Sequence, residues 1–89
     1  MKIVWDEPKR LANIDKHGLD FGDLNEAFFE DALFVPSKKG RFKGIGASTR
    51  GIICVVFAKL GSEGFSIISM RPASDGERKR YAERLKEEE

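Results

Sequence analysis

The 89-residue chain contains one cysteine, one histidine and no long apolar run. Because Cys54 is the only cysteine, an intramolecular disulfide is excluded and no cysteine cluster can bind zinc. Isoleucines and valines flank Cys54, so we expect a small buried hydrophobe there rather than a nucleophile. No apolar segment approaches the ~20 residues of a membrane span, and the N-terminus lacks the apolar region of a secretory signal. We therefore expect a cytoplasmic protein with no membrane partner and no metal or other cofactor.

The composition is that of one globular domain over residues 1–89. Hydrophobic residues make up 40% of the chain, enough for a modest core, and 16 basic side chains nearly balance 15 acidic ones. These charges are unevenly spread, because residues 32–62 carry six basic and no acidic side chains. Such a block could form a patch for a polyanion or an acidic partner, or it could keep strand edges from pairing. The six residues are Lys38, Lys39, Arg41, Lys43, Arg50 and Lys59.

The first third of the sequence predicts a short strand and two helices. Residues 3–5 are an apolar strand. Pro8 suits the first turn of a helix over residues 8–17, because its missing N–H would have no intrahelical partner there. Asp20 is a good N-cap for a second helix, predicted over residues 21–29. The side chains expected to face the core are those of Leu11, Ile14, Phe21, Leu24, Ala27 and Phe28.

The remainder predicts a three-stranded antiparallel meander. Residues 41–48 alternate as a half-buried strand does, and residues 52–58 are apolar throughout, as in a central strand covered on both faces. Residues 65–71 form the last strand. Residues 32–36 are either a short strand or an extended loop, and Pro36 argues against an interior strand there. The fold class is therefore α+β.

The last strand joins a closing helix at a stretch that is rich in cations. Arg71 ends the strand, and the Ser74-x-x-Glu77 capping pattern opens a helix from about residue 75 into a tail that we expect to fray. Arg78 and Tyr81 are three residues apart, which places them on one helix face. We expect guanidinium groups and a phenol to share a hollow suited to a phosphodiester. The alternative is an ordinary solvated helix face.

Cations on the preceding strand extend this prediction. Arg41 and Lys43 are two residues apart on one strand face, about 6.5 Å, so both can reach one oligonucleotide backbone. Arginines and lysines can stabilise the charge that develops on a phosphate, while a tyrosine, histidine or lysine moves the proton. RNA supplies its own nucleophile in the 2′-hydroxyl, so such a site needs no metal. DNA lacks that hydroxyl.

Three side chains keep two interpretations each. His17 suits proton transfer near neutral pH, or it stabilises the C-terminal end of its helix. Tyr81 either moves protons or anchors the closing helix to the sheet. Trp5 either stacks on a base or belongs to the core.

Several motifs in order resemble the BrnT toxin family. They are Trp5-Asp6-Glu7-Pro8-Lys9, Asn13, Lys16-His17-Gly18 with Phe21, Arg41 with Gly44-Ile45-Gly46, Ile67-Ile68-Ser69-x-Arg71, and Glu77-Arg78-x-x-Tyr81. The resemblance implies a RelE-like fold and a ribonuclease toxin that arrests translation by cutting RNA. It also implies neutralisation by a BrnA-type antitoxin in an assembly built on a toxin dimer.

The positions that match the family are the candidate catalytic residues. They are Lys16, His17, Arg41, Arg71, Arg78 and Tyr81. By their chemistry, Arg41 and Arg71 would bind the scissile phosphate, Tyr81 with His17 or Lys16 would move protons, and Arg78 would support charge or position RNA. Candidate RNA-binding residues are Lys38, Lys39, Lys43 and Arg50. The alternative is a binding module without catalysis, or a degenerate toxin, that uses the same basic face.

Overall fold

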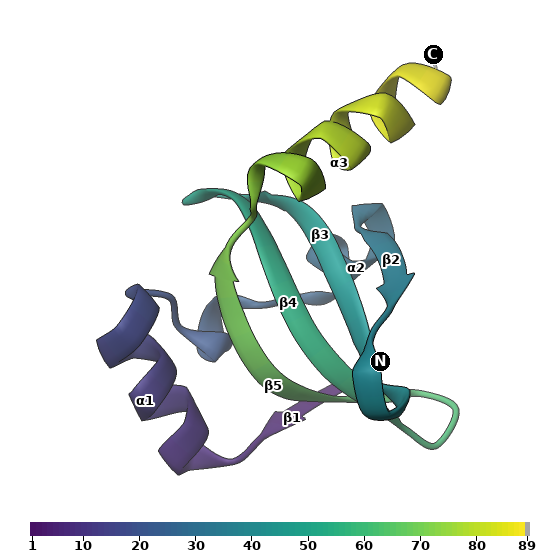
Figure 1. Ribbon diagram of the computed structural model, residues 1–89. Helices are drawn as coiled ribbons and strands as arrows, with labels where there is room; N and C mark the ends of the chain where they lie inside the picture. Colours follow the sequence, from purple (N-terminus) through teal and green to yellow (C-terminus); the bar gives the residue numbers. More distant parts are fainter. Residues whose placement is uncertain (89) are drawn as a thin grey trace.

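The computed structural model describes residues 1–88 and shows one five-stranded sheet with three α-helices (Figure 1). The strands are β1 (Lys2–Trp5), β2 (Leu33–Pro36), β3 (Phe42–Ser48), β4 (Gly51–Leu60) and β5 (Gly64–Pro72). The helices are α1 (Glu7–His17), α2 (Glu26–Asp31) and α3 (Asp75–Glu87), and two short 3₁₀ turns are η1 (Phe21–Asp23) and η2 (Lys38–Gly40). The α+β class is confirmed. Glu89, part of the tail predicted to fray, lies outside the described residues.

The strand order in the sheet is β1-β5-β4-β3-β2. β3, β4 and β5 form the predicted antiparallel meander, but the sheet is larger than predicted, because β2 pairs antiparallel with β3 and β1 pairs parallel with β5. β1 and β2 have only four residues each, and each is held in the sheet by pairing with a longer strand. In the pairing of β1 with β5, Lys2 lies opposite Gly64. β2 is thus a strand rather than a loop. It lies at the sheet edge, where Pro36 at its end is tolerated.

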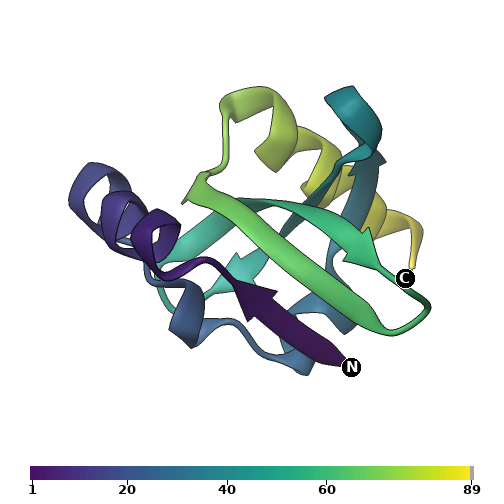
Figure 2. The same ribbon diagram turned by 90° about the horizontal axis from the view of Figure 1, so that it is seen from below.

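The two faces of the sheet are covered unequally. Ile53 and Phe57 of β4 point to one face, where they form the main core with Phe29 of α2; we call this the α2 face. Cys54 points to the opposite face, the α3 face, where it packs with Tyr81 of α3. In Figure 1, α2 lies behind the sheet and α3 crosses in front of its upper end. Figure 2 shows the same layers from below, with α3 on one side of the sheet and the blue segment before β2 on the other.

α1 is fixed to the edge of the sheet by a buried amide. The side chain of Asn13 accepts a hydrogen bond from the Met70 N–H (3.0 Å) and donates one to the Leu19 carbonyl (2.9 Å). Leu11, which was predicted to face the core, is 54% exposed, so that prediction was wrong. The reason is geometric, because two residues along an α-helix turn by about 200° and Leu11 therefore lies opposite Asn13. Ile14 is half-buried.

The single helix predicted over residues 21–29 is wrong, because two shorter turns replace it. Asp20 caps η1 by accepting from the Gly22 N–H (2.8 Å), and the chain then becomes extended at Leu24. Asn25 caps α2 by accepting from the Phe28 N–H (2.9 Å). An asparagine side chain competes for backbone donors in this way, which favours a helix start over a helix interior. The break leaves Ala27 exposed, although it was predicted to face the core.

α3 begins as the capping pattern predicts. Ser74 Oγ accepts from the Glu77 N–H (3.2 Å), and a Glu77 carboxylate oxygen accepts from the Ser74 N–H (2.9 Å). Further along α3, the Arg84 guanidinium donates to the Ala32 carbonyl just after α2, which ties the two helices together. No helix within residues 1–88 is long and apolar enough to cross a membrane.

Candidate active site

A carboxylate from α3 and two cations from the sheet converge on the α3 face. The Arg71 guanidinium donates two hydrogen bonds to Glu77, Nη1 to Oε1 at 2.7 Å and Nη2 to Oε2 at 2.9 Å. Lys43 Nζ lies 3.7 Å from Glu77 Oε2. The Glu77 side chain is only 13% exposed, whereas those of Arg71 and Lys43 are 32% and 35% exposed. The carboxylate therefore lies beneath, and the two cations keep faces open to solvent.

The strand register explains why these groups meet. Arg71 of β5 lies opposite Cys54 of β4, and Lys43 of β3 lies opposite Val56, two residues further along the same strand. Alternate residues share one face of a sheet, so both cations project from the α3 face. The capping box then fixes the first turn of α3 next to the end of β5. Glu77 in this turn thereby reaches both Arg71 of β5 and Lys43 of β3.

The contacts shift the ionisation of the cluster. The hydrogen bonds from Arg71, helped by the Ser74 N–H, lower the pKa of Glu77 to about 2. Glu77 in turn raises the pKa of Arg71. Burial raises the pKa of Cys54 to about 11, and its side chain is fully buried beneath the cluster, which disfavours the reactive thiolate form. The prediction of a buried Cys54 is confirmed.

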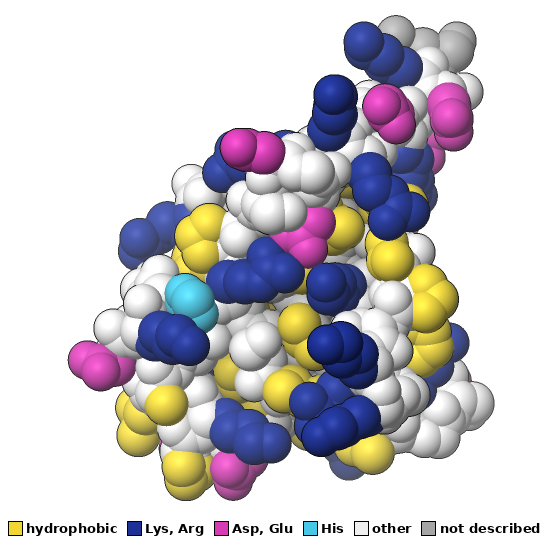
Figure 3. Space-filling model, in the orientation of Figure 1, with side chains coloured by type: hydrophobic (Ala, Val, Ile, Leu, Met, Phe, Trp, Pro, Cys, Tyr) yellow, Lys and Arg dark blue, Asp and Glu magenta, His cyan; other side chains and the backbone are white. Residues whose placement is uncertain are grey.

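Other candidate cations lie at the two ends of β3. Arg41 is half-buried and immediately precedes β3, two residues before Lys43, and the exposed Lys38 and Lys39 belong to η2 just before it. Arg50 lies in the turn between β3 and β4, at the opposite end of the strand. Figure 3 shows dark blue side chains gathered over the sheet below α3. The structure thus joins Lys43 with Arg71, places the η2 lysines beside Arg41, and separates Arg50 from them.

The two candidates on α3 have different surroundings. Arg78 is exposed, and its Nε donates to the Ala73 carbonyl (3.3 Å). Tyr81 is only 6% exposed and packs against Ile45, Cys54 and Ala73, as expected of a residue that anchors α3 to the sheet. Within residues 1–88, no hydrogen bond joins the Tyr81 hydroxyl to the Arg71–Glu77 pair. The structure does not bring this phenol to the cation cluster.

Lys16 and His17 lie in the last turn of α1. Asn13, one turn before His17, is bonded to the Met70 N–H, and Met70 directly precedes Arg71, so this end of α1 lies beside the end of β5. In Figure 3 the histidine, in cyan, lies on the same face as the cations. No side-chain hydrogen bond within residues 1–88 links His17 to the cluster.

Trp5 is partly buried and packs against the main core on the α2 face. Its ring packs edge-on against Phe21, with centroids 6.3 Å apart, and its indole N–H donates to Glu7 (3.1 Å). These contacts favour the structural interpretation of Trp5 over base stacking.

Sequence reasoning missed the tertiary contacts of Glu77 and Asn13, which join separate elements of the fold. Glu77 was recognised as part of a helix cap and of a family motif and not as a partner of Arg71, although its position six residues after Arg71 across a short bend was a usable signal. Asn13 was noted only as part of a motif, and no local pattern distinguishes a buried asparagine from an exposed one. Within residues 1–88, no group of three or more acidic, histidine or cysteine side chains could hold a metal ion.

A twisted five-stranded sheet with exposed cations over one face defines a small α+β protein equipped to bind an anion such as a phosphate. Residues 5–77 match the family model described as "Ribonuclease toxin, BrnT, of type II toxin-antitoxin system". The chain belongs to this BrnT family. Arg78 and Tyr81 lie just beyond the matched residues.

A solved structure supports the same conclusion. The chain is similar to the crystal structure of the Brucella abortus ribonuclease toxin BrnT, with 54% sequence identity and a TM-score of 0.78. The match covers 84% of this chain and 99% of that chain. No similar protein was found among curated protein sequences.

Proposed function

We propose that this chain is a metal-independent endoribonuclease toxin that arrests translation in the cytoplasm. In this proposal, residues 1–89 act as one RelE-like toxin domain, which forms a homodimer within its complex and is neutralised by a BrnA-type antitoxin. Membership of the ribonuclease toxin family supports the toxin role. The observation that carries the assignment of the site is the convergence of Arg71 and Lys43 on the α3 face with their outer surfaces exposed.

The phosphate would be held on this face. Arg71 and Lys43 both contact the carboxylate of Glu77, which already orders their side chains. They would therefore lose less conformational entropy when a phosphate binds. Arg41, which lies two residues before Lys43, would add a third cation, and Lys38 and Lys39 would bind the backbone further along. Arg78 at the edge of α3 would support or position the RNA.

The reaction would use the nucleophile of RNA itself. A base takes the proton of the 2′-hydroxyl, the 2′-oxygen attacks phosphorus, and the bond to the 5′-oxygen breaks as an acid protonates that oxygen. The products are a 2′,3′-cyclic phosphate and a 5′-hydroxyl. Lys16 and His17 lie at the edge of the cation face and are our first candidates for the proton steps. Tyr81 remains a candidate only if α3 moves, because within residues 1–88 its hydroxyl forms no hydrogen bond to the Arg71–Glu77 pair.

The test is incubation of the purified protein with single-stranded RNA in the presence of a chelator. We expect cleavage with new 5′-hydroxyl ends, none from an RNA blocked by 2′-O-methyl groups, and loss of cleavage in Arg71→Ala. Intact RNA with the wild-type protein, both in the purified reaction and after addition of ribosomes, would contradict the assignment.

A binding module without catalysis is the second candidate. One observation favours it: both Nη atoms of Arg71 already donate to Glu77, which leaves fewer donors for a phosphate in the transition state. This candidate predicts salt-sensitive retention of RNA without new ends. Expression without the antitoxin separates the two, because a toxin stops growth in the wild type and not in Arg71→Ala, whereas a binding module or a degenerate toxin leaves growth unchanged in both.

A further inference from the structure

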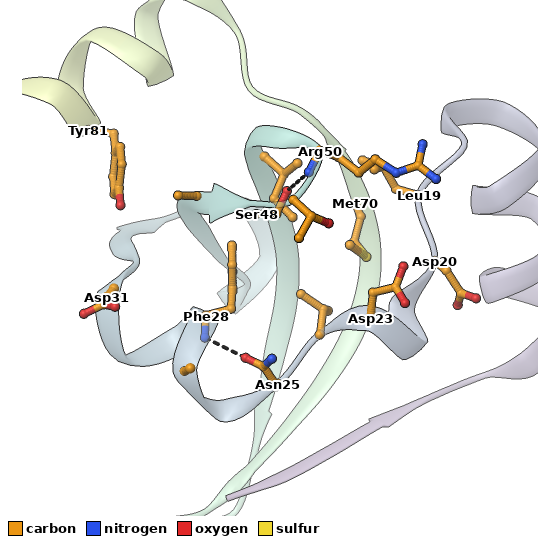
Figure 4. Close-up of a pocket in the computed structure, with 15 residues that line it drawn as sticks. Leu19, Asp20, Asp23, Asn25, Phe28, Asp31, Ser48, Arg50, Met70 and Tyr81 are labelled. Carbon is orange, nitrogen blue, oxygen red and sulfur yellow. Dashed lines mark hydrogen bonds between the residues drawn. The ribbon is translucent and has the colours of Figure 1, made fainter.

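A pocket of about 310 Å³ opens on the α2 face, between the η1–α2 segment and the β3–β4 turn (Figure 4). Its volume is about twice that of the ~150 Å³ apolar cavity that holds a benzene molecule in an engineered protein. Of the candidate catalytic and RNA-binding residues, two line this pocket, at its rim: Arg50 of the β3–β4 turn and Tyr81, which anchors α3. The proposed ribonuclease function therefore leaves the pocket unexplained.

The floor of the pocket is apolar. Ile53 and Met70 line it from the sheet and are buried, while Leu24 and Phe28 line it from the other wall and are only half-buried. Gly46 lets Phe28 approach the sheet closely, because a Cβ atom at this position would lie 3.0 Å from the Phe28 ring. An apolar side chain that entered here would complete the burial of Leu24 and Phe28, which favours binding by the hydrophobic effect.

The rim carries negative charge and a free hydroxyl. Asp23 and Asp31 line the pocket, are exposed and form no ion pair within residues 1–88, whereas Asp20 is already bound by Arg10. Tyr81 as a whole is only 6% exposed, but its hydroxyl forms no hydrogen bond within residues 1–88 and is in contact with solvent, because no buried side-chain polar atom there lacks a partner. Figure 4 shows the Tyr81 ring extending from α3 with its hydroxyl on the side of Asp31. Because this hydroxyl reaches solvent at the pocket, it is available to a ligand.

The pocket and the cation cluster lie on opposite faces of the sheet. Met70 and Ile53 point to the α2 face, while their chain neighbours Arg71 and Cys54 point to the α3 face. Asp23 and Asp31 outnumber the one cation at the rim, Arg50, and repel phosphates, which makes RNA a poor occupant. The charge instead complements a protein segment that presents an apolar side chain beside a lysine or arginine.

We propose that this pocket docks a segment of a partner protein that inserts one large apolar side chain between Phe28 and Met70. A lysine or arginine of that segment then pairs with Asp23 and Asp31, and a polar group meets the Tyr81 hydroxyl. Identification of the partner as the antitoxin rests on the proposed function. Binding on the α2 face would leave the cations of the α3 face open. A contact at this pocket therefore increases the affinity for the antitoxin and does not by itself block RNA binding.

The experiment measures the affinity of the full chain for a purified BrnA-type antitoxin. Ala27→Trp fills the pocket from an exposed position on α2, and Ala12→Trp on the exposed side of α1 is its matched control. Asp23→Lys with Asp31→Lys reverses the rim charge, and Asp15→Lys on α1 is the control. We expect each pocket variant to weaken antitoxin binding at least about tenfold, each control to bind as the wild type does, and RNA cleavage to stay within about twofold.

Each other outcome is decisive. Equal antitoxin binding by wild type and pocket variants, with unchanged melting temperatures, overturns the docking site alone. If the pocket variants lose RNA cleavage but still bind the antitoxin, the pocket binds RNA and the proposal is overturned. If they change only the oligomeric state, the pocket binds a second copy of this chain, which also overturns the proposal. If the wild type binds no antitoxin at all, the proposed partner fails as well.

Discussion

The Arg71 guanidinium and the Glu77 carboxylate form a two-point contact, with N···O distances of 2.7 and 2.9 Å, between the end of β5 and the first turn of α3. The same carboxylate accepts from the Ser74 N–H and lies 3.7 Å from Lys43 Nζ. One buried acid therefore fixes a helix cap and two cations from different strands. We infer that Glu77 is a positioning residue for Arg71 and Lys43, the cations proposed to bind the phosphate.

Glu77→Gln should reduce RNA cleavage at saturating RNA by about tenfold, because an amide cannot accept both guanidinium N–H groups and Arg71 loses its fixed orientation. Glutamine still completes the helix cap, so the fold is kept. Binding of a 2′-O-methyl RNA should be unchanged or tighter, since a negative charge is removed. Glu83→Gln, an exposed acid on the same helix, is the control. Wild-type cleavage in Glu77→Gln would refute the positioning role.

The stability of the protein should depend on acid pH through Glu77. The pKa of Glu77 falls from its ordinary 4.5 to about 2 in the folded chain. A lowered folded-state pKa stabilises the fold above the unfolded value, and this stabilisation is lost as pH falls from about 4.5 towards about 2. Chemical denaturation across this range should show a steeper fall in the unfolding free energy for the wild type than for Glu77→Gln. Parallel profiles would show that the pair contributes nothing to this acid sensitivity.

Asn13→Ala should destabilise the fold by about 1 to 3 kcal/mol, because it leaves the buried Met70 N–H and Leu19 carbonyl without their partner. Asp15→Ala changes an exposed residue of the same helix and serves as the control. Urea denaturation measures both. A loss below about 0.5 kcal/mol for Asn13→Ala would mean that water replaces the amide.

Two glycine substitutions should act in opposite directions. Gly46→Ala places a Cβ atom 3.0 Å from the Phe28 ring and should cost about 1 to 3 kcal/mol. Gly76→Ala, in the first turn of α3, meets nothing within 4 Å and should stabilise by a few tenths of a kcal/mol up to about 1 kcal/mol. Thermal melting of both variants checks this contrast, and equal shifts would contradict the close approach of Phe28 to the sheet.

The salt dependence of RNA binding should separate the two ends of β3. Lys43→Ala removes a cation beside Arg71 and should lower the slope of log affinity against log salt by about 0.7. Arg50→Ala removes a cation at the opposite end of the strand and should have a smaller effect. Filter binding of 2′-O-methyl RNA at several salt concentrations measures both slopes. An equal or larger effect of Arg50→Ala would place the RNA along the whole of β3.

Local patterns predicted those parts of the fold that depend on neighbouring residues. The apolar run of β4, the meander that contains it and the Ser74–Glu77 cap were all confirmed, because side-chain alternation and helix capping are properties of short stretches. The break at Asn25 was missed, because the apolar positions around it fit a helix as well as they fit two separate turns. The family was also recognised from ordered motifs, and the comparisons confirm it.

The sequence by itself determined the α+β class, the order of most elements, the family and the presence of enough cations to bind a phosphate. Tertiary structure alone decided which cations lie together, because Lys43 and Arg71 meet through strand register while Arg50 is at the far end of β3. It also decided that Tyr81 is buried and that β1 lies parallel to β5. The physical reason is that pairing between distant strands and packing between layers depend on contacts that no short stretch of the chain encodes.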